Sequence, residues 1–290
     1  MLRLPGISSA SFSPVTDALA LLFDDGVLQV RHGDRLHLEV ATGLFGIHGP
    51  RHAWSPDGSH ILVADAVTTQ VRDATTGTLI STWDALSGFF ATSWSPDGGL
   101  VASGGEDGCT IWDPRTGRPR RCLTPEGVVT WTAWSPDAAV LATGILLADD
   151  DFEVAFWDTR TGRQLRILTE VHWGETALWT PDGTRILTHC EEGSYVQEID
   201  TTSWEVRRGV EVRDFHSHTS PDWHPTGTVA ATGGSDGTVN IWDLASGRRL
   251  HRIPAHDSDV HHVEFNADGS RLLSIADDDT AHIWTFGGCR

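Results

Sequence analysis

A short motif recurs along this chain at nearly constant intervals: an aromatic residue followed by Ser or Thr, Pro, Asp and Gly. Its seven copies, two of them strongly altered, are FSP from Phe12, WSPDG from Trp54, WSPDG from Trp94, WSPDA from Trp134, WTPDG from Trp179, WHPTG from Trp223 and FNADG from Phe265. These aromatic anchors are separated by 42, 40, 40, 45, 44 and 42 residues. Such a period indicates a repeat architecture, in which each copy folds as one small unit.

The clearest copy, residues 223–253, shows what one period encodes. A turn through Pro225 and Gly227 follows the anchor Trp223, and a second tight turn lies at Ser235–Gly237, where glycine adopts positive φ at no steric cost. The intervening segments are rich in small and β-branched residues and are expected to be strands: Thr228–Thr232, Thr238–Trp242 and Arg248–Ile253. With the strand that ends at the anchor, each period predicts four short antiparallel strands.

One sheet of this size cannot bury two faces alone. In the expected strand Thr238–Trp242, Val239 and Ile241 point to one face while Thr238 and Trp242 point to the other, so both faces carry bulk. Seven sheets stacked around an axis would cover both faces of each. We therefore predict an all-β fold, a seven-bladed β-propeller with four antiparallel strands per blade, as a single domain over residues 1–290.

Closure of the ring raises a separate question. The last period ends in HIWTFGGCR, which supplies a third strand but no fourth, while the chain begins with MLRLPG. The segment Leu2–Leu4 resembles the fourth-strand segment Leu165–Ile167 of another period. We predict that residues 2–4 form the outer strand of the last blade and fasten the ring.

The two recurring patterns, W-[ST]-P-D-G and D-G-x-[VI]-x-I-W-D, resemble those of WD40 repeats, and the resemblance covers essentially the whole chain. The Trp-Asp pair of that family is intact at Trp112-Asp113, Trp157-Asp158 and Trp242-Asp243. The other periods depart from it, with Trp284-Thr285, Arg31-His32, Arg72-Asp73 and Ile199-Asp200 at the equivalent place. The fold assignment survives because the period and the turns persist there.

The resemblance also implies a hydrogen-bonded network of His, Ser or Thr, Asp and Trp within a blade. The residues that match it are His256, Ser274, Asp278 and Trp284 in the last period, Thr232, Asp236 and Trp242 in the sixth, and Ser103, Asp107 and Trp112 in the third. Such a network satisfies a buried indole N–H and holds a hairpin turn to the preceding loop.

Composition limits the partners. Forty acidic residues against 21 basic ones give a formal charge of −19, which repels phosphate backbones and anionic membranes. A basic protein or peptide is therefore the expected partner, nucleic acid is disfavoured, and no apolar run predicts a membrane span. The best local exception is the arginine group Arg115, Arg118, Arg120 and Arg121. We expect a monomer.

Residue usage also bears on the source and compartment. The four cysteines, Cys109, Cys122, Cys190 and Cys289, lack CxxC spacing, which favours a reducing cytoplasm. Every basic residue is arginine and asparagine occurs only at positions 240 and 266, which we interpret as the codon bias of a GC-rich bacterium.

Catalytic and metal-binding patterns are weak in this sequence. His216 and His218 alternate on one strand face, as in some zinc sites, but no fixed ligand signature surrounds them. No calcium loop, nucleophile elbow or phosphate-binding loop is present. We predict no catalytic residue, no metal and no cofactor. The alternative is a metal-dependent propeller hydrolase, similar to lactonases, with a site at the central channel.

The variable loops that enter each first strand share one rim with the turns between second and third strands. The opposite rim carries repetitive Thr-Gly-Arg turns, which are typical of a scaffold, whereas variable loops are typical of recognition. Aromatic and charged residues at corresponding loop positions are the candidate partner contacts: Trp173, Phe90, Glu175, Asp259, His261, His48 and Trp131. The sequence thus favours a non-catalytic scaffold or recognition module that binds a protein or peptide on this rim.

Overall fold

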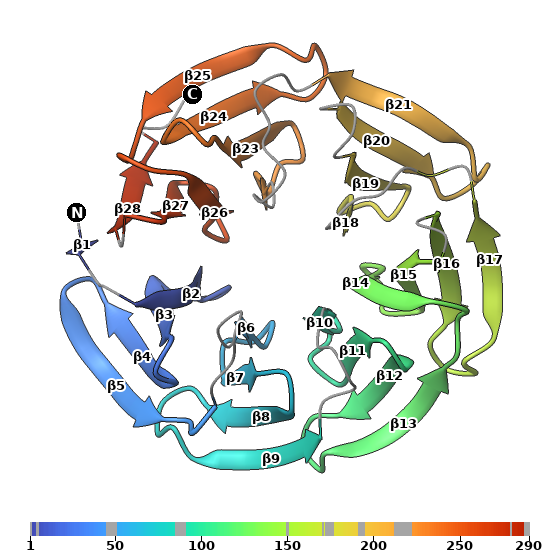
Figure 1. Cartoon of the computed structure of the whole chain (residues 1–290), viewed down its shortest axis with the longest axis horizontal. Coiled ribbons are helices and arrows are strands. Elements are labelled where there is room, and N and C mark those ends of the chain that lie inside the picture. The colour runs from blue at the N-terminus through green and yellow to red at the C-terminus, as the bar shows by residue number, and fades with distance from the viewer. Residues whose placement is uncertain are drawn as a thin grey trace.

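The computed structural model is a closed ring of seven antiparallel sheets, each with four strands (Figure 1). It describes residues 2–3, 6–44, 51–84, 91–148, 151–169, 171, 177–190, 195–211, 222–278 and 280–286. Within these ranges every regular element is a strand, and no helix long and apolar enough to cross a membrane occurs. The predicted all-β, seven-bladed propeller is confirmed.

Each blade follows the chain from the axis outward. Blade 1 comprises β2 (Ile7–Phe12), β3 (Ala18–Phe23), β4 (Val27–His32) and β5 (Arg35–Ala41), and blade 2 comprises β6 (Arg51–Trp54), β7 (His60–Ala64), β8 (Thr68–Asp73) and β9 (Leu79–Asp84). Blade 3 comprises β10 (Ala91–Trp94), β11 (Val101–Gly105), β12 (Gly108–Asp113) and β13 (Arg118–Leu123), and blade 4 comprises β14 (Val128–Trp134), β15 (Val140–Leu146), β16 (Phe152–Asp158) and β17 (Gln164–Leu168). Blades 5 to 7 comprise β18 (Ala177–Trp179), β19 (Arg185–Cys190), β20 (Tyr195–Asp200), β21 (Val206–Glu211); β22 (Asp222–Trp223), β23 (Val229–Gly233), β24 (Thr238–Asp243), β25 (Arg249–Pro254); and β26 (Val260–Phe265), β27 (Arg271–Ala276), β28 (Thr280–Thr285), with β1 (Leu2–Arg3) outside β28.

The two ends of the chain meet in blade 7, as the sequence predicted. Leu2 lies opposite Ala281 and Arg3 lies opposite Thr280 in an antiparallel pair between β1 and β28. The predicted third residue of this strand, Leu4, lies outside the described residues. The N-terminal strand therefore completes a sheet whose other three strands come from the C-terminal end of the chain.

Burial follows position within the blade. The middle strands β11 and β12 are buried at every residue because neighbouring blades cover both of their faces. The outer strand β13, in contrast, is exposed at five of its six residues. This gradient explains why β11 and β12 are rich in small and apolar residues while β13 carries three arginines.

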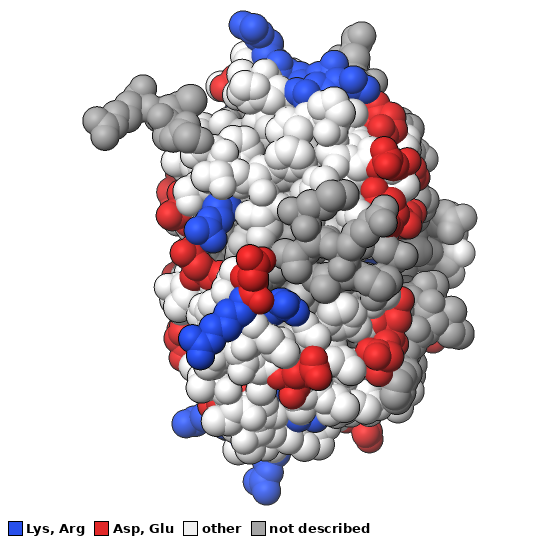
Figure 2. All heavy atoms as spheres, turned by 90° about the vertical axis from the view of Figure 1, so that its left-hand side faces the viewer, with Lys and Arg blue, Asp and Glu red and all other residues white. Residues whose placement is uncertain are grey.

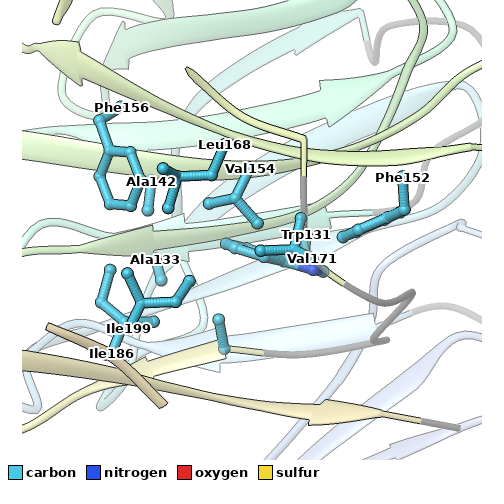
Figure 3. Close-up of a cluster of buried hydrophobic side chains, with 11 residues drawn as sticks. Trp131, Ala133, Ala142, Phe152, Val154, Phe156, Leu168, Val171, Ile186 and Ile199 are labelled. Carbon is cyan, nitrogen blue, oxygen red and sulfur yellow. The ribbon is translucent and has the colours of Figure 1, made fainter. Parts of the chain in front are cut away.

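Packing between blades forms the hydrophobic core. Figure 3 shows the cluster that joins blades 4 and 5, in which Val154 and Phe156 face Ile186 and Ile199. A corresponding cluster joins the last blade to the first, because Leu273 packs against residues of β2 and β3. The ring is therefore closed by side-chain packing as well as by strand pairing.

The recurring Ser-Pro-Asp-Gly turn has a local cause. Ser55 Oγ donates to Asp57 Oδ1 at 2.6 Å, the same carboxylate accepts the N–H of Ser59 at 3.0 Å, and Ser55 Oγ accepts the N–H of His60 at 2.9 Å. These bonds, with Ser55 the first cause, lower the pKa of Asp57 to about 2. Related Asp-centred turns follow the anchors of blades 3, 4, 5 and 7.

We expect Asp57→Asn to destabilise the protein by roughly 1 kcal/mol at neutral pH, a modest figure because the turn is exposed. The folded pKa lies below the ordinary value of about 4, so the contribution is complete above pH 4 and is lost as the pH falls toward 2. Urea unfolding of the variant and the parent protein at several pH values measures this difference. Asp17→Asn, in the turn of blade 1, is the control, and a difference that persists unchanged at pH 2.5 would contradict the assignment.

Deleting residues 1–5 should lower the melting temperature by several degrees, roughly 5 °C, because it removes β1 and leaves the β28 edge without that partner. Thermal unfolding followed by circular dichroism measures the effect. An unchanged melting curve would show that β1 does not fasten the ring.

Candidate functional site

Two surfaces can carry function in this ring: the inner wall made by the first strands, and the rim of loops that enter them. On the inner wall, the indole of four of the five Trp anchors reaches back to the preceding blade. It donates to the carbonyl of the residue just before that blade's own anchor, in the pairs Trp54 to Ser11 (3.2 Å), Trp94 to Ala53 (3.2 Å), Trp134 to Ser93 (3.2 Å) and Trp179 to Ala133 (3.1 Å). The same kind of hydrogen bond therefore recurs at four consecutive junctions between blades.

The two Phe anchors lack an indole, and a carboxylate makes the junction instead. Asp222 Oδ2 accepts the backbone N–H of Phe265 at 2.6 Å, and Glu264 Oε1 accepts the backbone N–H of Phe12 at 3.1 Å. Each acid occupies the place just before its own blade's anchor, the same place whose carbonyl accepts in the other blades. The acid thus replaces the indole bond with a charge-assisted one.

The junction between blades 5 and 6 differs from both kinds. Trp223 Nε1 is buried and has no hydrogen-bond partner among the described residues. A buried donor without a partner costs on the order of 1–3 kcal/mol. Among the described residues, this junction therefore lacks the indole bond found at the four preceding junctions.

A histidine reinforces the junction between blades 1 and 2. The two ring nitrogens of His52 lie 2.7 Å from Ser9 Oγ and 2.7 Å from Ser11 Oγ. Burial, followed by repulsion from His262, lowers the pKa of His52 to about 3. This imidazole is neutral at physiological pH and acts as a hydrogen-bonding bridge.

The pKa values of the two inner-wall carboxyl groups are raised, whereas that of His52 is lowered. Burial, followed by the negative charge of Glu264, raises the pKa of Asp222 to about 7. Burial also raises the pKa of Glu264, and His262, whose Nε2 lies 3.4 Å from Glu264 Oε2, opposes that shift. The Glu264 side chain keeps 23% of its surface exposed, so water moderates the effect. Near neutral pH, Asp222 is therefore present as a mixture of its protonated and ionised forms.

This inner-wall cluster can hold protons and hydrogen bonds, but it does not form a metal centre. Among the described residues no group of three or more His, Cys, Asp or Glu side chains is placed to hold a metal ion. The alternating His216 and His218 lie outside the described residues. The arrangement therefore offers acid, base and hydrogen-bonding groups whose partners are other parts of the ring.

The network expected from the resemblance is seen in its longest form in blade 7. Trp284 Nε1 donates to Ser274 Oγ at 3.0 Å, and His256 Nε2 lies 2.8 Å from the same oxygen. His256 Nδ1 lies 2.7 Å from Thr280 Oγ1 and 3.5 Å from Asp278 Oδ1, while the Thr280 hydroxyl also donates to Asp278. Thr280 is therefore an additional member between the histidine and the aspartate.

The other blades contain shorter versions. Trp242 donates to Thr232 at 3.0 Å and Trp112 donates to Ser103 at 2.8 Å. Asp236 accepts from Thr238 and pairs with Arg252 at 2.5 Å, and Asp107 lies in an exposed turn.

Sequence reasoning missed one such pair, in blade 4, where Trp157 donates to Thr143 at 2.9 Å. The intact Trp157-Asp158 dipeptide was the available signal, although 14 residues separate the two partners here, against 9 or 10 in the other three blades.

Trp131 is not a surface residue, which corrects its assignment as a partner contact. It lies in β14 and is only 4% exposed, packed beside Phe152 and Val171 (Figure 3). A β-bulge between Val129 and Trp131 shifts its register, and Gly144 leaves room for the indole, since a Cβ there would lie 2.2 Å from Trp131 Nε1. The ring fills the core of blades 4 and 5.

The remaining rim candidates divide into two groups. Asp259 is exposed between β25 and β26, and His261 is half-buried with Nε2 4.0 Å from Asp277 Oδ1. Burial, followed by His262, lowers the pKa of His261. The other four candidates, His48, Phe90, Trp173 and Glu175, lie outside the described residues.

Charge distinguishes the two rims. The described turns between second and third strands, with the loops that enter the first strands, contain twelve acidic residues and no arginine: Asp24, Asp25, Asp65, Glu106, Asp107, Glu126, Asp151, Asp236, Asp257, Asp259, Asp277 and Asp278. We call this surface the acidic rim. The opposite turns carry both signs, with Arg115, Arg160, Arg163 and Arg248 among them. In Figure 2 acidic side chains follow one margin of the disk from top to bottom, while the other margin mixes the two charges.

Comparison with known proteins agrees with the architecture. The family model described as WD domain, G-beta repeat, matches residues 77–113, 209–243 and 247–285. The matched segments belong to blades 2 and 3 and to blades 5 to 7. Over these segments the chain is similar to WD40 repeats, in agreement with the sequence pattern.

Three individual proteins are similar to short segments of the chain. The chain is 33% identical over 87 residues to eukaryotic translation initiation factor 3 subunit I of Pyricularia oryzae and 31% identical over 87 residues to that of Neurospora crassa, in each case 29% of this chain and 25% of the relative. It is 38% identical over 75 residues to transducin beta-like protein 3 of Bos taurus, which is 24% of this chain and 9% of the relative. The chain therefore matches a quarter or less of these relatives. All three are eukaryotic, so they give no support to the bacterial source expected from composition.

Asp222→Asn should make the protein more stable than the parent at pH 8, by roughly 1–2 kcal/mol. The folded pKa of about 7 lies above the ordinary value, so the parent loses stability as the pH rises from 4 to 7, and a neutral amide does not. The Asn oxygen can still accept the N–H of Phe265. Urea unfolding at pH 4.5 and pH 8 measures the two proteins, with the exposed Asp259→Asn as control. A variant less stable than the parent at pH 8 would contradict this assignment.

Proposed function

We propose that this WD40-repeat propeller, as one domain over residues 1–290, is a non-catalytic interaction module that binds a basic protein or peptide segment on its acidic rim. One observation carries the proposal: twelve carboxylates and no arginine on the described part of one rim, where loops of variable sequence meet. A surface of one sign attracts partners of the opposite sign and speeds their association. The −19 charge of the whole chain adds to this attraction.

The inner wall supports a structural role for the cluster there. Asp222 Oδ2 and Glu264 Oε1 each accept a backbone N–H of the next blade, and His52 has both ring nitrogens engaged. Groups committed to the fold in this way are poorly placed to turn over a substrate. Metal analysis of the purified protein tests the proposal: a stoichiometric zinc lost on substitution of His216 and His218 would favour the hydrolase instead.

The partner contacts on the rim extend the proposal to named residues. Asp259 and His261, with His48, Phe90, Trp173 and Glu175, are the proposed contacts, because an aromatic side chain beside carboxylates is typical of a binding hot spot. The names of the relatives, a translation initiation factor subunit and a transducin beta-like protein, fit an assembly role. We propose further that the protein acts in the cytoplasm as a monomer and contacts neither membrane nor nucleic acid through this rim. Its proposed source, a GC-rich bacterium, is checked by the base composition of the coding DNA.

The combined variant Glu106→Gln, Asp257→Asn, Asp259→Asn should bind a fluorescein-labelled oligoarginine about tenfold more weakly than the parent. Three exposed charge pairs together contribute on the order of 1.4 kcal/mol, which corresponds to that factor. Fluorescence anisotropy measures the affinity. The control removes the same charge from the opposite rim, through Asp17→Asn, Asp34→Asn and Glu205→Gln, and should change affinity less than about twofold. An equal loss in both variants would show that net charge, rather than this rim, attracts the peptide.

A further inference from the structure

The outer surface of blades 3 and 4 carries a charge opposite to that of the acidic rim. Six arginines gather there, on β13 and on the turns beside it: Arg115, Arg118, Arg120, Arg121, Arg160 and Arg163. We call this surface the arginine patch. The whole chain has 21 basic residues, so more than a quarter of them lie in two neighbouring blades.

The two halves of the patch are joined by a contact between blades. Arg121 of β13 donates from Nε and Nη2 to the backbone oxygen of Arg160 in the turn between β16 and β17, at 3.0 and 2.6 Å. That turn packs closely on the strand, since a Cβ at Gly162 would lie 3.5 Å from Arg121 Cδ. The turn between β16 and β17 therefore lies beside the end of β13 (Figure 1), and Arg160 and Arg163 in that turn add to the positive charge of the strand.

Few carboxylates offset these arginines. Asp113 is 3% exposed and is held by Arg120 at 2.5 Å, so it is largely withdrawn from the surface. Asp158 uses one oxygen to hold its own turn, by accepting the N–H of Thr161 at 2.7 Å and its hydroxyl at 2.6 Å.

Four guanidinium groups of the patch are left for a partner. In the part of the chain that the structure describes, the side chains of Arg115, Arg118, Arg160 and Arg163 form no ion pair within 4.0 Å. All but the last residue of β13 are exposed, so the backbone edge beside these side chains is reachable as well.

We propose that the arginine patch binds an extended acidic segment of a second protein, so that the module joins two partners of opposite charge. The inference goes beyond the proposed function because it concerns a different surface and a different partner. Guanidinium groups bind carboxylates with two parallel hydrogen bonds, which suits a row of Asp or Glu side chains.

Size favours a polypeptide over a nucleic acid. A strand of six residues is about 20 Å long, which matches about six residues of an extended peptide. Charges farther away than about 8 Å are screened at physiological salt, so a short peptide is affected mainly by the patch. A longer nucleic acid would run onto the acidic surface that gives the chain its charge of −19.

The test uses the full chain and a fluorescein-labelled oligoglutamate of about eight residues. The patch variant Arg118→Gln, Arg160→Gln, Arg163→Gln should bind it about tenfold more weakly than the parent, and binding should weaken as salt increases. Arg120 is left intact because its loss would leave Asp113 buried without its partner. The matched control, Arg35→Gln, Arg248→Gln, Arg271→Gln, changes the net charge equally at sites outside blades 3 and 4 and should bind within about twofold of the parent.

Equal weakening in the patch and control variants, or no binding by the parent, would overturn the proposal. Tighter binding of a single-stranded DNA with the same number of charges would overturn the choice of a protein partner. Oligoarginine binding by the patch variant tests the proposed function separately, because the acidic rim is unchanged in that variant. Loss of oligoglutamate binding alone therefore bears only on this inference.

Cys122 supplies a second readout within the patch. It is exposed on β13 next to Arg121, whereas Cys109 is buried and burial raises its pKa to about 12. Saturating oligoglutamate should slow alkylation of Cys122 by iodoacetamide several-fold, as followed by peptide mass spectrometry. An unchanged alkylation rate in the presence of bound peptide would place the peptide elsewhere and contradict the proposal.

Discussion

Every feature of this protein depends on the contact between neighbouring sheets around the axis. A single blade exposes two apolar faces, and only the adjacent blades cover them, so no sheet is stable until the ring is nearly complete. The first strands carry the polar part of this contact. Indoles and carboxylates on the inner wall satisfy backbone groups that the sheets themselves leave unpaired. Closure by β1 belongs to the same constraint, since it ties the first blade to the last.

This arrangement separates the scaffold from the surfaces that recognise partners. The Asp-centred turns after the anchors repeat because the same hydrogen bonds build each one. On the other rim the turns between second and third strands repeat a simpler bond, in which Asp25, Asp65, Asp236 and Asp278 each accept the N–H of the residue two places later. The loops that enter the first strands vary in sequence and also accumulate acidic residues. Outer strands form a third surface. Their exposed residues need only be compatible with the edge strand of a sheet. The acidic rim arises on the rim of variable loops, whereas the arginine patch spans the outer strand β13 and the neighbouring turns of the scaffold rim, where Arg115, Arg160 and Arg163 lie.

The sequence predicted the fold well because its evidence is local. Anchor spacing, turn chemistry and the apolar faces of the third strands determine the blade, and the segment at residues 2–4 was recognisable from its likeness to another outer strand. Trp131 was misplaced because a bulge in β14 and a glycine across the sheet decide its direction, and neither follows from loop counting. The roles of Asp222 and Glu264 depend on which backbone N–H faces them from the next blade. Nevertheless, a signal was present: each acid lies one repeat before a Phe anchor, where the indole bond is absent.

The distribution of these junctions shows how stability is shared around the ring. From blade 1 to blade 5 each junction has an indole bond, which does not titrate. From blade 5 onward the junctions consist of a buried indole without a described partner, then an aspartate and a glutamate with raised pKa values. Near neutral pH the anchor junctions therefore form a pH-insensitive arc of indole bonds and a titrating arc that contains the carboxyl groups, and the titrating arc includes the blade that β1 closes. Asp259 lies in the loop that enters the first strand of blade 7, and His261 lies in that strand. The titrating arc therefore also positions these two proposed partner contacts. The arginine patch lies on blades 3 and 4, within the pH-insensitive arc, so the two surfaces rest on parts of the ring with different electrostatic behaviour.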